Sequence, residues 1–306
     1  MQTILGANGI IGIHTARALT NYTSRIRLVS RNPQKVNASD ELVSADLTNE
    51  RQTFEAVKGS EVAYLTIGLP YSLSSWETQW PIVMANVINA CKEHQTKLVF
   101  LDNVYAYGRT TSWMTEETPF NPCSKKGEIR AKIAQQLLDE MHTGSISGII
   151  ARSADFYGPN TENSFLNKMV FEKYAQHKSA LWMINENLKH SFTYTPDAGS
   201  ALALLGNSHQ AFGQTWHLPT HKDVLTGKEM IELIATAFAC APNYSVLKKW
   251  MLQMVSWFNP IVHENMEMLY QNEGDYLFSS AKFEKAFSFE PSSYKRGVVD
   301  TVASLL

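Results

Sequence analysis

Hydrophobic and polar positions follow two alternating periodicities in the first half of the chain. Short, nearly continuous apolar runs are separated by longer stretches in which apolar residues recur every three or four positions. The short runs are typical of strands buried on both faces, and the longer stretches are typical of amphipathic helices. The pattern predicts strands at 2–5, 26–30, 62–66, 97–102 and 146–151, with helices at 10–20, 50–58, 78–94 and 129–141.

Strands that alternate with helices in this way indicate βαβ units. We therefore expect an α/β fold with a Rossmann-type, doubly wound parallel sheet. From about residue 158 the chain changes to longer polar and aromatic stretches, and Thr226 with Glu229 predicts a capped helix at 226–239. The layout expected is one domain over residues 1–158, to which 190–240 partly return, and a smaller C-terminal α/β domain over 159–306.

Three glycines follow the first predicted strand and lead into the first helix. Gly6 permits a tight turn, Gly9 lets a phosphate approach the backbone, and Gly12 lets the helix pack on the strand. This arrangement predicts a dinucleotide whose pyrophosphate rests on the helix N-terminus. The alternative is a tight turn without a ligand. The cofactor-binding residues assigned to the turn are Gly6, Asn8, Gly9, Ile10, Ile11 and Gly12.

Further cofactor contacts are expected where the next strands end. A strict NAD site carries an acid after the second strand, whereas this chain has Arg31 there. Arg31 fits the extra phosphate of NADP, so NADP is expected, with NAD as the alternative cofactor; a solvated surface arginine is the other interpretation. Asp46 and Leu47 would contact the adenine, although Asp46 could equally cap the next helix. Thr66 and Gly68 are small enough for a cofactor to cross the sheet edge, and Lys126 is also assigned a cofactor contact.

Composition narrows the class of partner. The chain has 306 residues, 44% of them hydrophobic, and a formal net charge of -2. Near-neutral charge gives no electrostatic footprint for nucleic acid or an anionic membrane, so we expect neither partner, only a small-molecule substrate. Residues 250–262 are too short to cross a bilayer. Three scattered cysteines and no metal-ligand spacing indicate a cytoplasmic protein without a metal.

Motifs along almost the whole chain extend this picture. The chain resembles an extended short-chain dehydrogenase/reductase of the NAD-dependent epimerase/dehydratase family. The resemblance implies an NAD(P)-binding domain and a substrate domain. It also implies an epimerase, dehydratase or reductase acting on a small carbonyl or hydroxyl compound or on a sugar nucleotide, and it suggests a homodimer. The matching segments are 6–12, 46–47, "DNVYAYG" (102–108), 115–122, "RSADFYGP" (152–159), 190–202 and 277–298.

The chain departs from the family at the catalytic groups. Members use a tyrosine as general acid/base with a lysine four residues later, and the segment "CSKKGEIRAKIAQQLL" contains no tyrosine. Aligning Lys126 with that tyrosine places Arg130 at the lysine, and Asn103 stands at the usual serine. A shifted register pairs Glu128 with Lys132 instead.

Two interpretations follow from the missing tyrosine. In the first, catalysis persists with Lys126 as acid/base, its pKa lowered by Arg130, and with Asn103 donating to a substrate oxygen; Tyr105 or Tyr107 is the alternative proton group. In the second, the protein is a regulator or redox sensor that binds a dinucleotide without turning it over. Arg152 is expected to be buried and paired.

Overall fold

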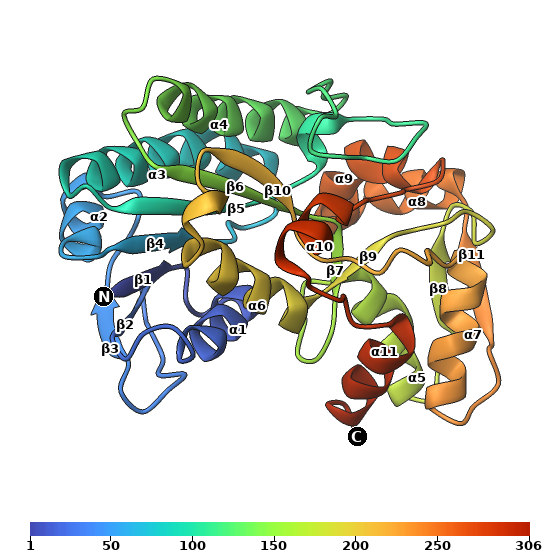
Figure 1. Cartoon of the computed structure of the whole chain (residues 1–306). Coiled ribbons are helices and arrows are strands. Elements are labelled where there is room, and N and C mark those ends of the chain that lie inside the picture. Colours follow the sequence, from blue (N-terminus) through green and yellow to red (C-terminus); the bar gives the residue numbers. More distant parts are fainter. The chain divides into compact units, whose positions relative to one another are not determined.

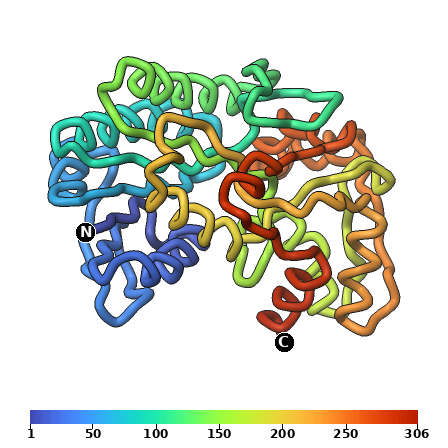
Figure 2. Tube along the Cα trace, in the orientation of Figure 1, coloured from blue at the N-terminus to red at the C-terminus, as the bar shows by residue number.

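The computed structural model describes residues 1–306. Contacts between Cα atoms divide the chain into two compact units. The first unit comprises residues 1–106, 125–153 and 196–218, and the second comprises 107–124, 154–195 and 219–306. Figures 1 and 2 trace both units along the chain.

A seven-stranded parallel sheet forms the centre of the first unit, as predicted. The strand order is β10-β6-β5-β4-β1-β2-β3, so β1 lies inside the sheet between β2 and β4. Leu5 at the end of β1 is in register with Val29 of β2 and with Leu65 of β4. The carboxyl ends of these three strands therefore meet at one edge. The strands are β1 (Gln2–Leu5), β2 (Ile26–Ser30), β3 (Glu41–Ser44), β4 (Val62–Leu65), β5 (Lys97–Asn103), β6 (Gly148–Ser153) and β10 (Gln214–His217).

Helices cover both faces of this sheet (Figure 1), which explains why β1 and β4 are buried along their whole length. Two helices begin earlier than the periodicity predicts. Helix α3 begins at Leu73 rather than at residue 78, because the Ser72 hydroxyl accepts a hydrogen bond from the Ser75 amide and caps it. Helix α4 begins at Lys125 rather than at 129. The helices are α1 (Ile10–Leu19), α2 (Glu50–Val57), α3 (Leu73–Glu93), α4 (Lys125–His142) and α6 (Thr195–Gly206).

Residues 196–218 belong to the first unit because β10 pairs with β6 and α6 packs closely on α1. A Cβ atom added at Gly199 of α6 would lie 2.4 Å from the Cβ of His14. Only glycine permits this close approach of the two helices. The predicted strand at 146–151 runs from Gly148 to Ser153, since Ser145 still belongs to the turn after α4, where its amide donates to the Glu140 carbonyl.

Two short parallel sheets and six α-helices make up the second unit. In one sheet β7 (Asp155–Tyr157) pairs with β9 (Phe192–Tyr194), and in the other β8 (Ala180–Met183) pairs with β11 (Tyr244–Leu247). The capping box at Thr226 and Glu229 is confirmed. A cluster of buried aromatic and aliphatic side chains forms the core. The helices are α5 (Glu172–Ala175), α7 (Gly227–Ala237), α8 (Lys249–Ser256), α9 (Pro260–Asn265), α10 (Ala281–Phe287) and α11 (Tyr294–Ala303).

No helix in the structure combines the length and the apolar composition that crossing a membrane requires.

Candidate functional site

The turn between β1 and α1 is built around two glycines that no other residue could replace without strain. Gly6 has a φ of 101°, and a Cβ there would lie 2.6 Å from the backbone nitrogen of Ile67. A Cβ on Gly12 would lie 2.8 Å from the carbonyl oxygen of Gly6. The backbone approaches itself so closely at Gly6 and Gly12 that the start of α1 lies directly against the end of β1.

Gly9 has a different environment. A Cβ there would be in ordinary van der Waals contact with the carbonyl oxygens of Gly6 at 3.5 Å and Thr66 at 3.9 Å, without the close backbone clash found at Gly6 and Gly12. Gly9 is also the N-cap of α1, with no side-chain capping bond and no acidic residue in the first turn. The first-turn N–H groups and the positive end of the helix dipole therefore remain available to an anion. The turn fits a bound phosphate.

The segment after β2 is tied to this turn. The Asn8 side-chain amide donates to the Asn32 carbonyl at 2.7 Å, and its oxygen accepts from the Gln34 amide at 3.3 Å. Arg31, which directly precedes Asn32, is exposed. Asn8 thus fixes the backbone beside Arg31 while the guanidinium extends toward solvent.

Asp46 and Leu47 follow β3. One carboxylate oxygen of Asp46 accepts from both the amide and the hydroxyl of Thr48, at 2.9 and 2.8 Å. These hydrogen bonds lower the pKa of Asp46, so the carboxylate is ionised at neutral pH. Asn49 is the N-cap of α2, so Asp46 shapes the preceding turn and does not cap the helix itself. Leu47 is buried.

Thr66 and Gly68 lie just after β4. The Thr66 amide donates to the Leu5 carbonyl at 2.8 Å, which joins the end of β4 to the glycine turn. A Cβ added at Gly68 would meet nothing within 4 Å. Thr66, which is hydrogen-bonded to the end of β1, and Gly68, which has free space beside it, therefore lie close together at the edge where β1, β2 and β4 end.

A second group of predicted residues gathers at the start of α4. Lys126 is only 1% exposed, and its Nζ lies 5.0 Å from the ring centroid of Tyr71. The Tyr71 hydroxyl lies 3.4 Å from the Tyr105 hydroxyl. The Tyr105 amide in turn donates to the Asn103 side-chain oxygen at 3.0 Å. Lys126, Tyr105 and Asn103 are thus connected through Tyr71. We call these four residues the Lys126 cluster.

Sequence reasoning missed Tyr71, which lies between β4 and α3. Its ring meets Trp76 edge-on at 5.5 Å, and Trp76 stacks on Tyr105 at 6.1 Å. The segment "YSLSSW" carries two aromatic residues five positions apart. That spacing gives no catalytic signal, because only the fold brings it next to the start of α4.

Arg130 has different partners from Lys126. Its guanidinium binds the Asp102 carboxylate, with Nε to Oδ1 at 2.8 Å, and lies 4.4 Å from the Trp80 ring. Arg152 binds the other oxygen of Asp102 at 3.0 Å, which confirms that Arg152 is buried and paired. All three charged groups are almost completely buried. Arg130 is therefore part of a buried ion network in which the Asp102 carboxylate binds two arginines.

The pairing of Asp102 with Arg152 has a signal in the sequence. Both residues lie near the ends of consecutive parallel strands, and they are in register in the sheet. A buried acid and a buried base at matching strand ends are expected to pair, because an isolated buried charge is costly. The contribution of Arg130 from α4 required the structure.

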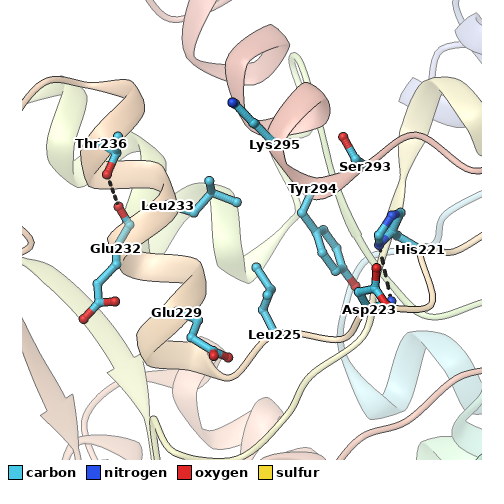
Figure 3. Close-up of a pocket in the computed structure, with 10 residues that line it drawn as sticks. All are labelled: His221, Asp223, Leu225, Glu229, Glu232, Leu233, Thr236, Ser293, Tyr294 and Lys295. Carbon is cyan, nitrogen blue, oxygen red and sulfur yellow. Dashed lines mark hydrogen bonds between the residues drawn. The ribbon is translucent and has the colours of Figure 1, made fainter.

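A cavity of about 500 Å³ lies in the second unit between α7 and α11 (Figure 3). None of the predicted cofactor or catalytic residues lines it. Figure 3 shows acidic side chains from α7 on one side and the Tyr294 ring beside His221 on the other. The cavity is therefore separate from the glycine turn and the Lys126 cluster. Its lining residues are His221, Asp223, Leu225, Glu229, Glu232, Leu233, Thr236, Ser293, Tyr294 and Lys295.

Comparison with known proteins adds a family and a fold. The model of the NAD dependent epimerase/dehydratase family matches residues 3–216. A search of curated proteins found no match.

Several solved structures share the fold along nearly the whole chain. The UDP-glucose 4-epimerase of Thermus thermophilus, in complex with NAD, has a TM-score of 0.80 at 16% identity, covering 100% of this chain and 99% of that one. The UDP-glucuronic acid 4-epimerase of Bacillus cereus, also with NAD, has a TM-score of 0.81 at 15% identity, covering 100% and 98%. The DesIV dTDP-glucose 4,6-dehydratase of Streptomyces venezuelae, with NAD and DAU bound, gives 0.81 at 14%, covering 99% and 96%.

Proposed function

Because this chain belongs to the NAD-dependent epimerase/dehydratase family, we propose that it binds a nicotinamide dinucleotide at the Gly6–Gly12 turn and acts on a sugar nucleotide or another small carbonyl or hydroxyl substrate. The observation that carries the proposal is the uncapped N-terminus of α1 at Gly9, directly after a tight glycine turn. Gly6 and Gly12 keep the turn beside this N-terminus tight.

The first-turn amides of α1, including those of Ile10 and Ile11, would hold the pyrophosphate. Asp46 and Leu47 would receive the adenine, and Thr66 with Gly68 would form the surface across which the cofactor lies. When bound, the nicotinamide supplies a hydride donor or acceptor.

The Lys126 cluster supplies the polar groups for proton transfer. Tyr105 is partly exposed, Lys126 is buried behind Tyr71, and the two phenol oxygens lie 3.4 Å apart. The Tyr105 and Tyr71 oxygens are close enough to exchange a proton, and Lys126, whose Nζ lies 5.0 Å from the Tyr71 ring centroid, would be the general acid/base. Asn103 would donate from its Nδ2 to a substrate oxygen. Arg130 has a positioning role, because it fixes α4 to β5 through Asp102.

Cofactor preference depends on Arg31. The solved neighbours described above were obtained with NAD, so they give no support to a preference for NADP. The preference for NADP is based only on an exposed arginine at the end of β2.

A regulator that binds the dinucleotide without turnover is the second candidate function. The burial of Lys126 favours it, since an amine only 1% exposed must be uncovered before it can reach a substrate. The homodimer suggested by the family resemblance also stays a prediction.

Binding is tested by thermal unfolding with NAD(H) and NADP(H). At one hundred times the dissociation constant the parent should gain about 2.7 kcal/mol of stability. Gly9→Val should fold, because the N-cap backbone is extended and a Cβ there makes only ordinary van der Waals contacts, yet its side chain should block the phosphate and remove the gain. Gly274→Val is the control at a distant glycine, since a Cβ there meets nothing within 4 Å. A Gly9→Val protein that still binds would remove the glycine turn as the site.

Turnover separates the two candidate functions. The enzyme hypothesis predicts a change in nicotinamide absorbance, or epimerised product, with at least one substrate from a panel of sugar nucleotides and small carbonyl compounds. Dinucleotide binding with no turnover across that panel would favour the regulator.

A further inference from the structure

A long loop connects two residues of the Lys126 cluster, Tyr105 and Lys126. It comprises residues 108–124, begins directly after the short 3₁₀ helix Tyr105–Tyr107 and ends directly before α4. The loop contains no helix or strand, only an isolated bridge at Met114. Loops longer than about 12–15 residues without regular structure are uncommon in compact domains and are usually functional. Because both of its ends lie at the Lys126 cluster, the placement of this loop, here called the connecting loop, bears on the placement of Tyr105 and Lys126.

The middle of the connecting loop is fixed in the second unit. The Met114 amide donates to the Leu277 carbonyl at 2.8 Å, and the Ser279 amide donates to the Met114 carbonyl at 3.0 Å. The Met114 side chain is buried at this bridge. The two limbs on either side of it, residues 108–113 and 115–124, need further contacts to stay in place.

Arg109 ties the first limb of the loop to the rest of the second unit. Its Nη2 lies 2.6 Å from Oε2 of Glu273, and the other oxygen, Oε1, lies 2.6 Å from Nζ of Lys249. The Glu273 side chain is only 19% exposed, whereas those of Arg109 and Lys249 are 56% and 59% exposed. The hydrogen bonds from Lys249 and Arg109 lower the pKa of Glu273, so its carboxylate is ionised at neutral pH. Exposed ion pairs contribute little, but a shielded carboxylate that binds two cations forms a small charge network, which contributes more.

The two limbs of the connecting loop meet directly beside Arg109. Gly108 has a φ of 67°, and a Cβ added there would overlap the carbonyl oxygen of Asn121 on the second limb. The ring of Phe120 on the same limb lies 6.4 Å from the ring of Tyr107, measured between centroids. Since the limbs pack this closely, a displacement of Arg109 would also displace the limb that leads into α4.

We propose that Arg109 and Glu273 are positioning residues for the Lys126 cluster. Their ion pair holds the first limb of the connecting loop, and through the loop it keeps Tyr105 and Lys126 in the arrangement that turnover requires. This inference rests on the proposed function, since a side-chain arrangement affects turnover only where a substrate reacts. Lys249 binds the same carboxylate at the same distance, but it lies in α8 and not in the loop. Loss of Lys249 should therefore leave the loop in place.

Hydrogen exchange at the Tyr105 amide tests the proposal without substrate or cofactor. This amide donates to the Asn103 side-chain oxygen, so its exchange rate reports whether these two residues of the Lys126 cluster keep their arrangement. Arg109→Gln should accelerate the exchange about three- to fivefold, whereas the matched control Lys249→Gln should change it less than about twofold. Arg109→Lys keeps the charge and should restore most of the protection. High salt should accelerate the exchange in the parent but not in Arg109→Gln, because salt screens the ion pair.

Steady-state kinetics tests the effect on turnover. With a substrate that the parent turns over, Arg109→Gln should lower kcat about three- to fivefold and leave the affinity for the dinucleotide unchanged, and Lys249→Gln should keep the kcat of the parent. An unchanged kcat or an unchanged Tyr105 exchange rate in Arg109→Gln would overturn the proposal, and so would equal effects in Lys249→Gln. A parent that turns over no substrate would instead overturn the proposed function, and the exchange rates would still show whether the ion pair orders the loop.

Discussion

The glycine turn and the start of α4 lie in the same compact unit, yet they differ in how their chemistry is specified. At the turn, the backbone itself is the binding group: glycine spacing after a strand gives the shape, and the helix N-terminus gives the donors. At the start of α4, side chains are the functional groups, and their directions depend on neighbours far away in the sequence. A motif that acts through backbone can therefore be recognised from spacing alone, whereas a motif that acts through side chains cannot.

Lys126 and Arg130 show this difference most clearly. They are four residues apart on one helix, so the sequence predicts that they share a face. In the structure Lys126 contacts the Tyr71 ring, whereas Arg130 lies among Trp80, Phe100 and Asp102. Asp102 offsets only part of the charge of Arg130, because Arg152 binds the same carboxylate.

The largest expected effect is the loss of turnover when Lys126, at the start of α4, is replaced. Once a substrate is found, Lys126→Met should reduce turnover by roughly 10²–10⁴-fold with cofactor binding retained, because a general acid/base group is lost. Lys125→Met is the matched control: this neighbouring lysine is exposed and pairs with Glu128, so its loss should leave turnover unchanged. Steady-state kinetics with both variants is the measurement.

Phenol variants locate the proton group within the Lys126 cluster. Unchanged turnover in Lys126→Met, together with a large loss in Tyr105→Phe, would move the proton chemistry to the loop after β5. A large loss in Tyr71→Phe, with Tyr105→Phe active, would assign it to the residue that the sequence did not indicate. If no variant differs from the parent, the side chains at this end of α4 are structural.

The fold was predictable from sequence to a large extent, because periodicity and strand–helix alternation are local signals. The strands at 2–5 and 26–30 were predicted with their observed bounds. Helix α3 was predicted too late because Ser72 supplies a cap upstream of the apolar repeat.

The second prediction breaks the ion network behind α4. Asp102→Asn leaves two buried arginines without their carboxylate and should reduce the free energy of unfolding by about 3–5 kcal/mol, the usual cost of removing one partner of a buried ion pair. Denaturant unfolding measures it. Glu61→Gln removes an exposed carboxylate that pairs with the N-terminus and should have little effect. A loss below about 1 kcal/mol in Asp102→Asn would show that the network is dispensable.

The third prediction examines the one place where the cofactor site depends on a side-chain charge. Arg31→Ala should weaken NADP binding by about 1.5–3 kcal/mol and leave NAD binding nearly unchanged, if the guanidinium contacts a 2′-phosphate. Calorimetric titration with both dinucleotides distinguishes the cases. Equal losses would make Arg31 a structural or adenine-stacking residue, and no loss would make it a solvated surface group.

The smallest expected effect concerns His14, a side chain in the helix that follows the glycine turn. Burial, with a smaller contribution from the charge of Arg17, lowers the pKa of His14 from 6.5 to about 4. The unfolded chain therefore takes up a proton on His14 at a higher pH than the folded chain does. Stability should be unaffected by this group above pH 6.5 and should fall as the pH decreases from there toward 4.

At one pH unit below the unfolded pKa the loss should be about 1.4 kcal/mol. The variant His14→Leu cannot take up the proton, so its stability should depend less on pH in this window than that of the parent. His209→Gln, at an exposed histidine, should keep the pH dependence of the parent. Urea unfolding at several pH values is the measurement. Identical pH profiles for the parent and His14→Leu would mean that the imidazole is protonated in the folded state as readily as in the unfolded chain, and that the close packing of α6 on α1 does not depend on its neutral form.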